Sequence, residues 1–258
     1  MKSCNRIFRA LLLLTTTISL SSLAGEIEKG FTSMFNGKDL TGWEGLPGAW
    51  SVVDCAITAE STPEKPCKQA HYIMWRGGKP GDFELRTDFR LQGASGNSGI
   101  QFRSRELPNW DTSGYQADME NGGQWFGCLF EHTRAGIAMR GEKVFIDKDG
   151  KKTVAPITVS EKVQKLTADN GAAGGNLSLN AALLRQVKMG EWNSYTIIAR
   201  GPDITLKIND IVMSQVTDQQ SGVAAKDGVI ALQMHPGPPM KVQFKNIRIK
   251  LLDPKSGN

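Results

Sequence analysis

The chain has 258 residues, of which 40% are hydrophobic and 22% are charged, and a formal net charge of +5 at pH 7. The basic residues Lys2, Arg6 and Arg9 lie in an N-terminal segment without acidic residues, so the rest of the chain carries +2, that is, 5 minus 3. No cluster of Lys and Arg with interleaved aromatic residues appears. The charge therefore gives no indication of nucleic-acid binding.

Residues 1–24 have the pattern of a secretory signal peptide, with a basic start, an apolar run and a small-residue site ending at Ala24. A membrane anchor is the rival interpretation, but the apolar run is short for a bilayer span and rich in Thr and Ser. Cys4 precedes the run, which disfavours a lipoprotein. We expect an exported protein, periplasmic or secreted, without integral membrane association after cleavage.

Residues 25–258 show no Pro/Ser-rich linker and no internal repeat, which favours one domain. Cys55 and Cys67 flank a Pro-containing loop, so a local disulfide is compatible with export. Cys128 lies in an apolar run and is expected to be a buried free thiol. The cysteine spacing fits no zinc-site pattern.

Period-two patterns dominate this part of the chain. Apolar or β-branched residues occupy every second position over 83–91, 195–199 and 204–208, which predicts half-buried strands. Asn209-Asp210 between two such runs predicts a tight hairpin. The last run changes parity, which a β-bulge near Lys245-Asn246 would explain. Many short strands separated by turn residues predict an all-β, antiparallel sandwich or barrel.

One segment departs from this pattern. Residues 151–190 include a stretch rich in Ala, Gly and Asn, and one helix-like piece from Asn180 to Lys188 with apolar residues at i, i+3 and i+4. We interpret the segment as a long insertion with one short helix. It either shapes a binding site or is a mobile loop without a role.

Several motifs in chain order carry a resemblance to a known family. They are Phe31–Trp43, Trp50–Ile57, Asp82–Leu85, Gly96–Ser104, Ser113–Met119, Trp125–His132, Gly190–Asn193, Leu232–His235 and Val242–Ile249. Together they resemble the 3-keto-disaccharide hydrolase family, whose fold is a concanavalin A-like jelly roll. Cys55 stands where the family usually has Gly, and His132 stands where Glu is commoner.

The resemblance implies cleavage of 3-keto-glycosides, either by removal of the C2 proton, elimination of the aglycone and hydration, or by direct hydrolysis. The elimination route needs a base, donors for the developing enolate and a group that protonates the leaving oxygen. The candidate catalytic residues are Asp118, His235, Glu131 and Arg103, with Arg103 as an oxyanion or hydroxyl ligand. Asp118, Glu131 and His235 are also acceptable ligands for a divalent metal ion.

Alternation along strands predicts which of these side chains share a face. Gln101 and Arg103 are expected on one face of a strand, and Gln116 and Asp118 on one face of another. If both faces line a groove, it would bind a small carbohydrate. The candidate substrate-binding residues are Gln101, Gln116, Tyr115, Trp125 and His132.

Other interpretations of the same residues stay open. Arg103 and Asp118 would also make an ordinary cross-strand ion pair, and Tyr115 and Trp125 would also serve as core aromatics. A non-catalytic, lectin-like module on the same fold is the main alternative function. A conventional glucanase ranks third, because Asp118-Met119-Glu120 does not match the Glu-x-Asp-x-x-Glu pattern that supplies its paired carboxylates.

Overall fold

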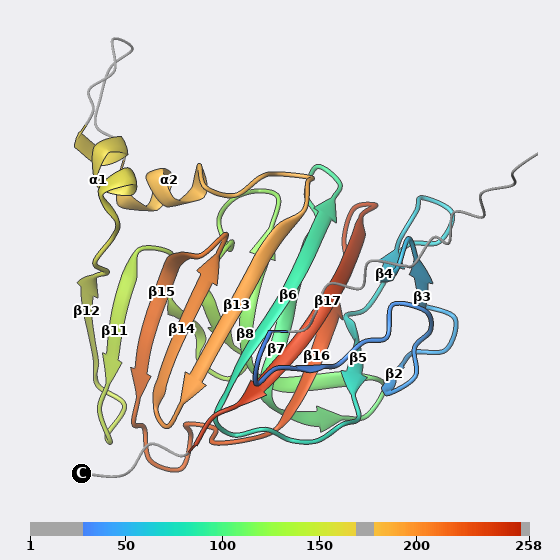
Figure 1. Ribbon diagram of the computed structural model, residues 1–258, viewed down its shortest axis with the longest axis horizontal. Coiled ribbons are helices and arrows are strands. Elements are labelled where there is room, and N and C mark those ends of the chain that lie inside the picture. The colour runs from blue at the N-terminus through green and yellow to red at the C-terminus, as the bar shows by residue number, and fades with distance from the viewer. Residues whose placement is uncertain (1–27, 169–177, 254–258) are drawn as a thin grey trace, which may run out of the picture.

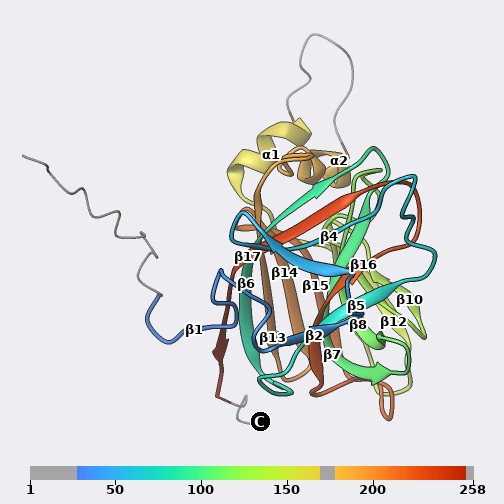
Figure 2. The same ribbon diagram turned by 90° about the vertical axis from the view of Figure 1, so that its right-hand side faces the viewer.

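Two β-sheets packed face to face form the body of the protein, and two short helices lie at one end of it (Figures 1 and 2). The computed structural model describes residues 28–168 and 178–253. The predicted leader, residues 1–24, lies outside the described residues and remains a prediction. Neither helix of the described part has the length and apolar character of a membrane span. The prediction of an all-β sandwich of the jelly-roll type is confirmed.

The larger sheet has ten strands and the smaller has seven, and all pairs are antiparallel except β11 with β15. The larger sheet follows the order β12 (Lys152–Pro156), β11 (Glu142–Ile146), β15 (Ile211–Asp218), β14 (Asp203–Ile208), β13 (Asn193–Arg200), β6 (Phe83–Gln92), β17 (Lys241–Leu251), β4 (Ala56–Glu60) and β3 (Trp50–Val53), with β1 (Thr32–Ser33) beside β17. The smaller sheet follows the order β10 (Ala135–Ala138), β9 (Leu129–Glu131), β8 (Asp111–Glu120), β7 (Asn97–Leu107), β16 (Val229–Met234), β5 (His71–Trp75) and β2 (Trp43–Gly45).

The core lies between the sheets and follows the period-two pattern. In β6, Phe83, Leu85, Thr87, Phe89 and Leu91 are buried, while the residues that alternate with them are half-buried on the opposite face. The inner face of the smaller sheet contributes residues such as Ile100 to the same cluster. Burial of such side chains stabilises the fold by roughly 1.5–3 kcal/mol each.

The predicted hairpin and bulge are confirmed. Asn209 and Asp210 join β14 to β15 with φ values of 50° and 62°, the left-handed conformation of a two-residue type I′ turn. The pairing of β17 with β6 shifts between Lys245 and Arg248, and Asn246 has φ = 52°. The bulge lets both parities of the last strand contribute to the core.

The described part of the insertion contains two helices rather than the one predicted. Helix α2 (Leu179–Leu184) begins after Ser178, whose hydroxyl accepts a hydrogen bond from the Ala181 amide, and it ends earlier than predicted. Helix α1 (Glu161–Ala168) was not predicted, because over residues 161–167 only Val163 is a fully buried apolar residue and one buried position gives little periodicity.

The cysteines of the described part are free thiols. Cys128 is buried, as expected, but the local bridge between Cys55 and Cys67 does not form. Cys55 is exposed in the β3–β4 turn, whereas the Cys67 thiol donates to the carbonyl oxygen of Gln69 at 3.0 Å. The two thiols thus belong to differently oriented loops.

The β7–β8 hairpin bends at a bulge and returns toward β5. Its pairing shifts between Phe102 and Arg105, and Arg103 has φ = 47°. Beyond the bend, the Trp110 carbonyl accepts a hydrogen bond from the Tyr72 amide at 2.8 Å. The lower right of Figure 1 shows the far ends of both strands near β5. The bend thus ties the tip of the hairpin to β5.

Candidate functional site

Polar side chains gather on the outer face of the smaller sheet, opposite the core. They come from four neighbouring strands, β8, β7, β16 and β5. All are buried although they point away from the core. We call this set the amide face, and it consists of Tyr72, Gln101, Gln116, Asp118 and Gln233.

A directed chain of hydrogen bonds joins the amide face. Gln101 Nε2 donates to Gln116 Oε1 at 2.6 Å, and Gln116 Nε2 donates to Asp118 Oδ1 and, at 3.2 Å, to Gln233 Oε1. Gln233 Nε2 donates to the Tyr72 hydroxyl at 2.8 Å. Each amide is oriented by its neighbour, so the polar groups are preorganised.

A glycine makes room for the central amide of this chain. Gly99 pairs with Asp118 across β7 and β8, and a Cβ atom at Gly99 would lie 2.5 Å from the Gln116 side chain. The missing side chain therefore leaves the space through which Gln116 reaches both Asp118 and Gln233. Close approach of this kind is a common reason for glycine within a strand.

Asp118 is the acidic group of the amide face, and no cation of the described residues lies beside it. Its side chain is only 5% exposed. Burial raises the pKa of Asp118 to about 8, the hydrogen bond from Gln116 lowers it, and the charge of Glu120 raises it further. The hydrogen bonds of the described residues reach only its Oδ1 atom. Asp118 can therefore exchange a proton near neutral pH through a free oxygen.

His132 and two aromatic residues form the rim of the amide face. The exposed imidazole has Nδ1 3.4 Å from Gln101 Nε2 and Nε2 3.5 Å from the Tyr72 hydroxyl. Phe130 packs edge-on against His132, and Trp125 packs edge-on against Phe130. Trp125 and Phe130 are half-buried and present partly exposed rings, as sugar-binding sites often do.

Two members of the amide face were missed from the sequence. Gln233 alternates with buried Leu232 and Met234, and Tyr72 precedes buried Ile73. The signal for Gln233 was a polar residue enclosed by apolar ones at a strand position. No local sequence pattern predicts that β16, which carries Gln233, lies beside β7, which carries Gln101.

Arg103 does not lie on the face of Gln101, so this expectation is wrong. The bulge and the left-handed backbone turn its side chain to the end of the sandwich. There Nε donates to the Gly81 carbonyl at 2.8 Å, Nη1 to the Gly201 carbonyl at 2.7 Å, and Nη2 to Asp82 at 3.0 Å. A cross-strand ion pair with Asp118 is absent from the described residues for the same reason.

Tyr115 and Glu131 are also absent from the amide face, because their strand positions point them into the sandwich. The Tyr115 hydroxyl donates to Asp218 at 2.5 Å, and Arg134 pairs with Asp218 at 2.8 Å and with Glu131 at 3.1 Å. We call Tyr115, Glu131, Arg134 and Asp218 the ion cluster. Tyr115, Asp218 and Arg103 line a pocket of about 530 Å³ at this end of the molecule.

His235 lies beyond the end of β16, next to the amide face but not joined to it. Its Nδ1 atom is 2.6 Å from the Pro236 carbonyl, and no hydrogen bond of the described residues connects it to Asp118. Asp118, Glu131 and His235 therefore do not assemble as metal ligands. Within residues 28–168 and 178–253, no three His, Cys, Asp or Glu side chains are grouped to hold a metal ion.

Known proteins resemble this chain both in fold and in sequence. Two crystal structures from Parabacteroides distasonis ATCC 8503, each named a "putative glycosyl hydrolase", share the fold. One is 20% identical with a TM-score of 0.53 and covers 87% of this chain and 94% of its own; the other is 19% identical with a TM-score of 0.52 and covers 86% and 99%. No curated protein has a matching sequence.

The sequence itself matches one family model over most of its length. Residues 30–250 match the model described as a 3-keto-alpha-glucoside-1,2-lyase-like domain. The match supports a carbohydrate-active function. The chain therefore belongs to the family of 3-keto-alpha-glucoside-1,2-lyase-like domains, as its motifs predicted.

Proposed function

We propose that this protein is an enzyme that cleaves 3-keto-glycosides on the amide face, with Asp118 as the group that moves protons. Family membership supports the substrate class. The observation that carries the assignment of Asp118 is a buried carboxyl group with a free oxygen and no neighbouring cation. Carboxyl groups whose pKa is displaced toward neutrality are typical of proton transfer in active sites.

The chemistry follows from the ketone. A carbonyl at C3 acidifies the C2 proton, which the Asp118 carboxylate removes. The electron pair spreads over C2, C3 and the C3 oxygen, and the bond from C1 to the aglycone oxygen then breaks. Asp118 passes its proton to the departing oxygen. In the second half, Asp118 takes a proton from water and gives it to C2 while the hydroxyl bonds to C1, which completes a net hydrolysis.

The amides and the phenol of the amide face would stabilise the enolate. Negative charge that develops on the C3 oxygen is best stabilised by fixed donors in a site without bulk water. Gln101 and Gln233 each have a second amide hydrogen beyond the one given to the neighbour, and Tyr72 supplies a hydroxyl. Both amide hydrogens of Gln116 are used within the amide face, so Gln116 orients the other groups. At the rim, His132 would bind a sugar hydroxyl and Trp125 would stack on a ring.

A direct test compares an oxidised disaccharide with its unoxidised parent. We expect the wild-type protein to cleave only a disaccharide carrying a keto group at C3, and to do so faster as the pH rises through about 8, because the carboxylate is the active form of Asp118. Asp118→Asn should lower kcat/KM by about a thousandfold. The matched control is Asp88→Asn, which changes an aspartate of β6 on the larger sheet that accepts a hydrogen bond from Asn246.

Three outcomes would reject the proposal. Wild-type rates in Asp118→Asn would remove Asp118 from the chemistry. Tight binding of sugars without cleavage of the keto-disaccharide would favour a lectin-like module, for which the aromatic rim of Trp125 and Phe130 is the supporting feature. Cleavage of the unoxidised sugar alone would favour a conventional glycosidase.

Export is part of the proposal because the N-terminal pattern predicts it. We expect protein recovered from the cell exterior or the periplasm to begin at Gly25, as N-terminal sequencing would determine. Recovery of the intact N-terminus from the cytoplasm would contradict it.

A further inference from the structure

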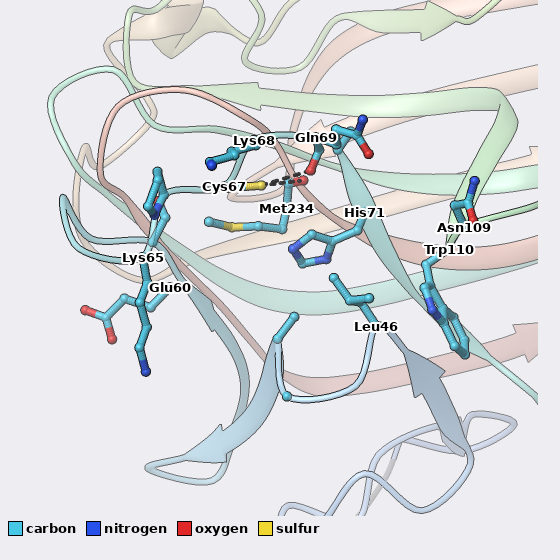
Figure 3. Close-up of a pocket in the computed structure, with 15 residues that line it drawn as sticks. Leu46, Glu60, Lys65, Cys67, Lys68, Gln69, His71, Asn109, Trp110 and Met234 are labelled. Atoms are coloured by element: carbon cyan, nitrogen blue, oxygen red, sulfur yellow. Dashed lines mark hydrogen bonds between the residues drawn. The ribbon is translucent and has the colours of Figure 1, made fainter.

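A pocket of about 820 Å³ opens at the side of the sandwich, away from the rim of the amide face. It lies where the β2–β3 turn, the loop between β4 and β5, and the tip of the β7–β8 hairpin meet (Figure 3). Its volume is within the range of pockets that hold small organic ligands. The residues that recognise a ligand there come from three different segments: Trp110, His71, Lys65 and Lys68, above a floor of Met234 and Leu46.

Trp110 is held at the tip of the β7–β8 hairpin. Asn109 and Trp110 both have φ = 62°, the left-handed conformation that also forms the Asn209-Asp210 turn. The Tyr72 amide fixes this geometry through its 2.8 Å hydrogen bond to the Trp110 carbonyl. The half-exposed indole forms one wall of the pocket (Figure 3). The pocket therefore has an aromatic wall of fixed position.

His71 supplies a hydrogen-bond donor of defined tautomer. Trp50 Nε1 donates to His71 Nδ1 at 3.1 Å, and burial lowers the pKa of His71, so the imidazole is neutral at pH 7 and carries its proton on Nε2. None of the described residues accepts a hydrogen bond from that Nε2 atom. In Figure 3 the ring lies between Met234 and Leu46, at the centre of the lining.

Two lysines add cationic donors to the pocket. Glu60 is 3.7 Å from Lys241, whereas the ammonium groups of Lys65 and Lys68 have no ion-pair partner within the described part of the chain. Donors that lack acceptors surround a floor made apolar by Met234 and Leu46. This combination suits a ligand with one apolar face and several oxygen acceptors, which describes a sugar ring.

The pocket is adjacent to the amide face but separate from it. Tyr72 takes part in both, since its hydroxyl joins the amide face while its main-chain amide holds Trp110. Ala70 lines the pocket and packs against the Tyr72 cluster. A ligand in the pocket would therefore lie near the sheet that carries Asp118 without touching the amides.

We propose that this pocket is a second carbohydrate-binding site, in which a sugar ring stacks on Trp110 and accepts a hydrogen bond from His71 Nε2. The class of ligand rests on the proposed function, but the location of the site does not. The site would retain part of a longer glycan beside the reacting disaccharide. The oxygen that accepts this hydrogen bond can belong to a sugar hydroxyl or to the carboxylate of a uronate. Lys65 and Lys68 would strengthen binding of a uronate.

The test measures binding of unoxidised oligosaccharides by titration calorimetry. Maltotetraose and cellotetraose are the neutral probes, and trigalacturonate is the acidic probe. Trp110→Ala should weaken binding about tenfold or more, and Trp110→Phe should restore part of it. Trp192→Ala is the matched control, because Trp192 is a half-buried tryptophan held by Arg90 and Lys245 elsewhere on the molecule. Thermal unfolding of each variant checks that the fold is retained.

The outcomes separate this inference from the proposed function. Binding of any probe that Trp110→Ala weakens and Trp192→Ala leaves unchanged supports the second site, even if no keto-disaccharide is cleaved. Cleavage by the wild-type protein without binding of any probe overturns the second site alone. Binding that is insensitive to Trp110→Ala overturns it as well.

Discussion

The amide face and the ion cluster each contain a buried aspartate, yet the two carboxyl groups have opposite surroundings. Asp218 is 3% exposed and is bound by Arg134 at 2.8 Å, the Tyr115 hydroxyl at 2.5 Å and the Gln220 amide at 3.1 Å. Asp118 is 5% exposed and is bound by the neutral amide of Gln116. One charge is compensated by a cation and the other is not.

This difference separates a structural role from a chemical one. A buried ion pair with satisfied hydrogen bonds stabilises one arrangement of the strands that carry it. A buried carboxyl group without a cation costs free energy once it ionises, and folds tolerate that cost mainly where function requires it. The contrast supports a structural role for the ion cluster and is consistent with the proton transfer proposed for the amide face.

The largest effect should follow from breaking the ion cluster. Arg134→Met leaves Asp218 and Glu131 without their cation, so we expect the free energy of unfolding to fall by about 3 kcal/mol. Urea unfolding at pH 7 measures this change. Cleavage of a 3-keto-glycoside by the folded fraction should stay close to the wild-type rate.

The double variant Arg134→Met/Asp218→Asn is the control for that prediction. Removing the stranded charge of Asp218 should recover about 1 kcal/mol of the loss. If Arg134→Met unfolds like the wild type but loses activity, the ion cluster belongs to the chemistry and the contrast drawn above is wrong.

A smaller effect is expected from neutralising Asp118, and it should depend on pH. The pKa of Asp118 is about 8 in the folded protein and 3.8 in the reference state. The unfolded chain therefore releases the Asp118 proton between about pH 4 and pH 8 while the folded chain retains it, and stability falls as the pH rises through this window. Asp118→Asn abolishes this contribution.

Thermal unfolding at two pH values measures the linkage. The gain in Tm from Asp118→Asn should be at least about 5 °C larger at pH 8 than at pH 4, which corresponds to roughly 2 kcal/mol. Asp88→Asn should show no such difference. A gain that is equal at both pH values would mean that Asp118 ionises normally in the folded state.

The smallest effect concerns the space beneath Gln116. Gly99→Ala places a methyl group 2.5 Å from that side chain, so Gln116 must move and its hydrogen bond to Asp118 is lost. We expect about a tenfold loss of kcat/KM, because proton transfer is sensitive to small displacements. Loss of that hydrogen bond should also raise the pH at which activity appears, since Gln116 lowers the pKa of Asp118.

Gly136→Ala provides the comparison for this variant. A Cβ atom at Gly136 would meet its nearest neighbour, the Met139 sulfur, at 3.6 Å, which is an ordinary contact. It should keep wild-type activity and pH dependence. Equal activity in both variants would show that Gln116 does not orient Asp118.

The sequence allowed prediction of the fold because burial alternates visibly along its strands. The bulge in β17 was predictable since Val242 and Ile247 show different parity. The bulge in β7 was not, because Gln101 and Arg103 continue the polar alternation and residue type does not reveal the left-handed backbone of Arg103. That one conformation moved Arg103 from the expected face to the end of the sandwich.

The candidate site was predictable only within single strands. Gln116 and Asp118 share a face as expected. The same alternation directs Tyr115 to the opposite face, into the core, so the prediction of Tyr115 as a substrate ligand was inconsistent with the strand pattern. The assembly of Gln233 and Tyr72 beside them depends on the strand order β8-β7-β16-β5. That order joins segments far apart in the chain, which local patterns do not encode.

The most direct test of the account is cleavage of a 3-keto-disaccharide in D₂O, followed by proton NMR over the first turnovers. Proton transfer through Asp118 predicts that the released 3-keto sugar carries deuterium at C2, and that Asp118→Asn yields almost no such product. A 3-keto monosaccharide kept in D₂O without enzyme corrects for spontaneous exchange. Enzymatic product that retains its original hydrogen at C2 would contradict abstraction of the C2 proton and, with it, the assigned role of the amide face.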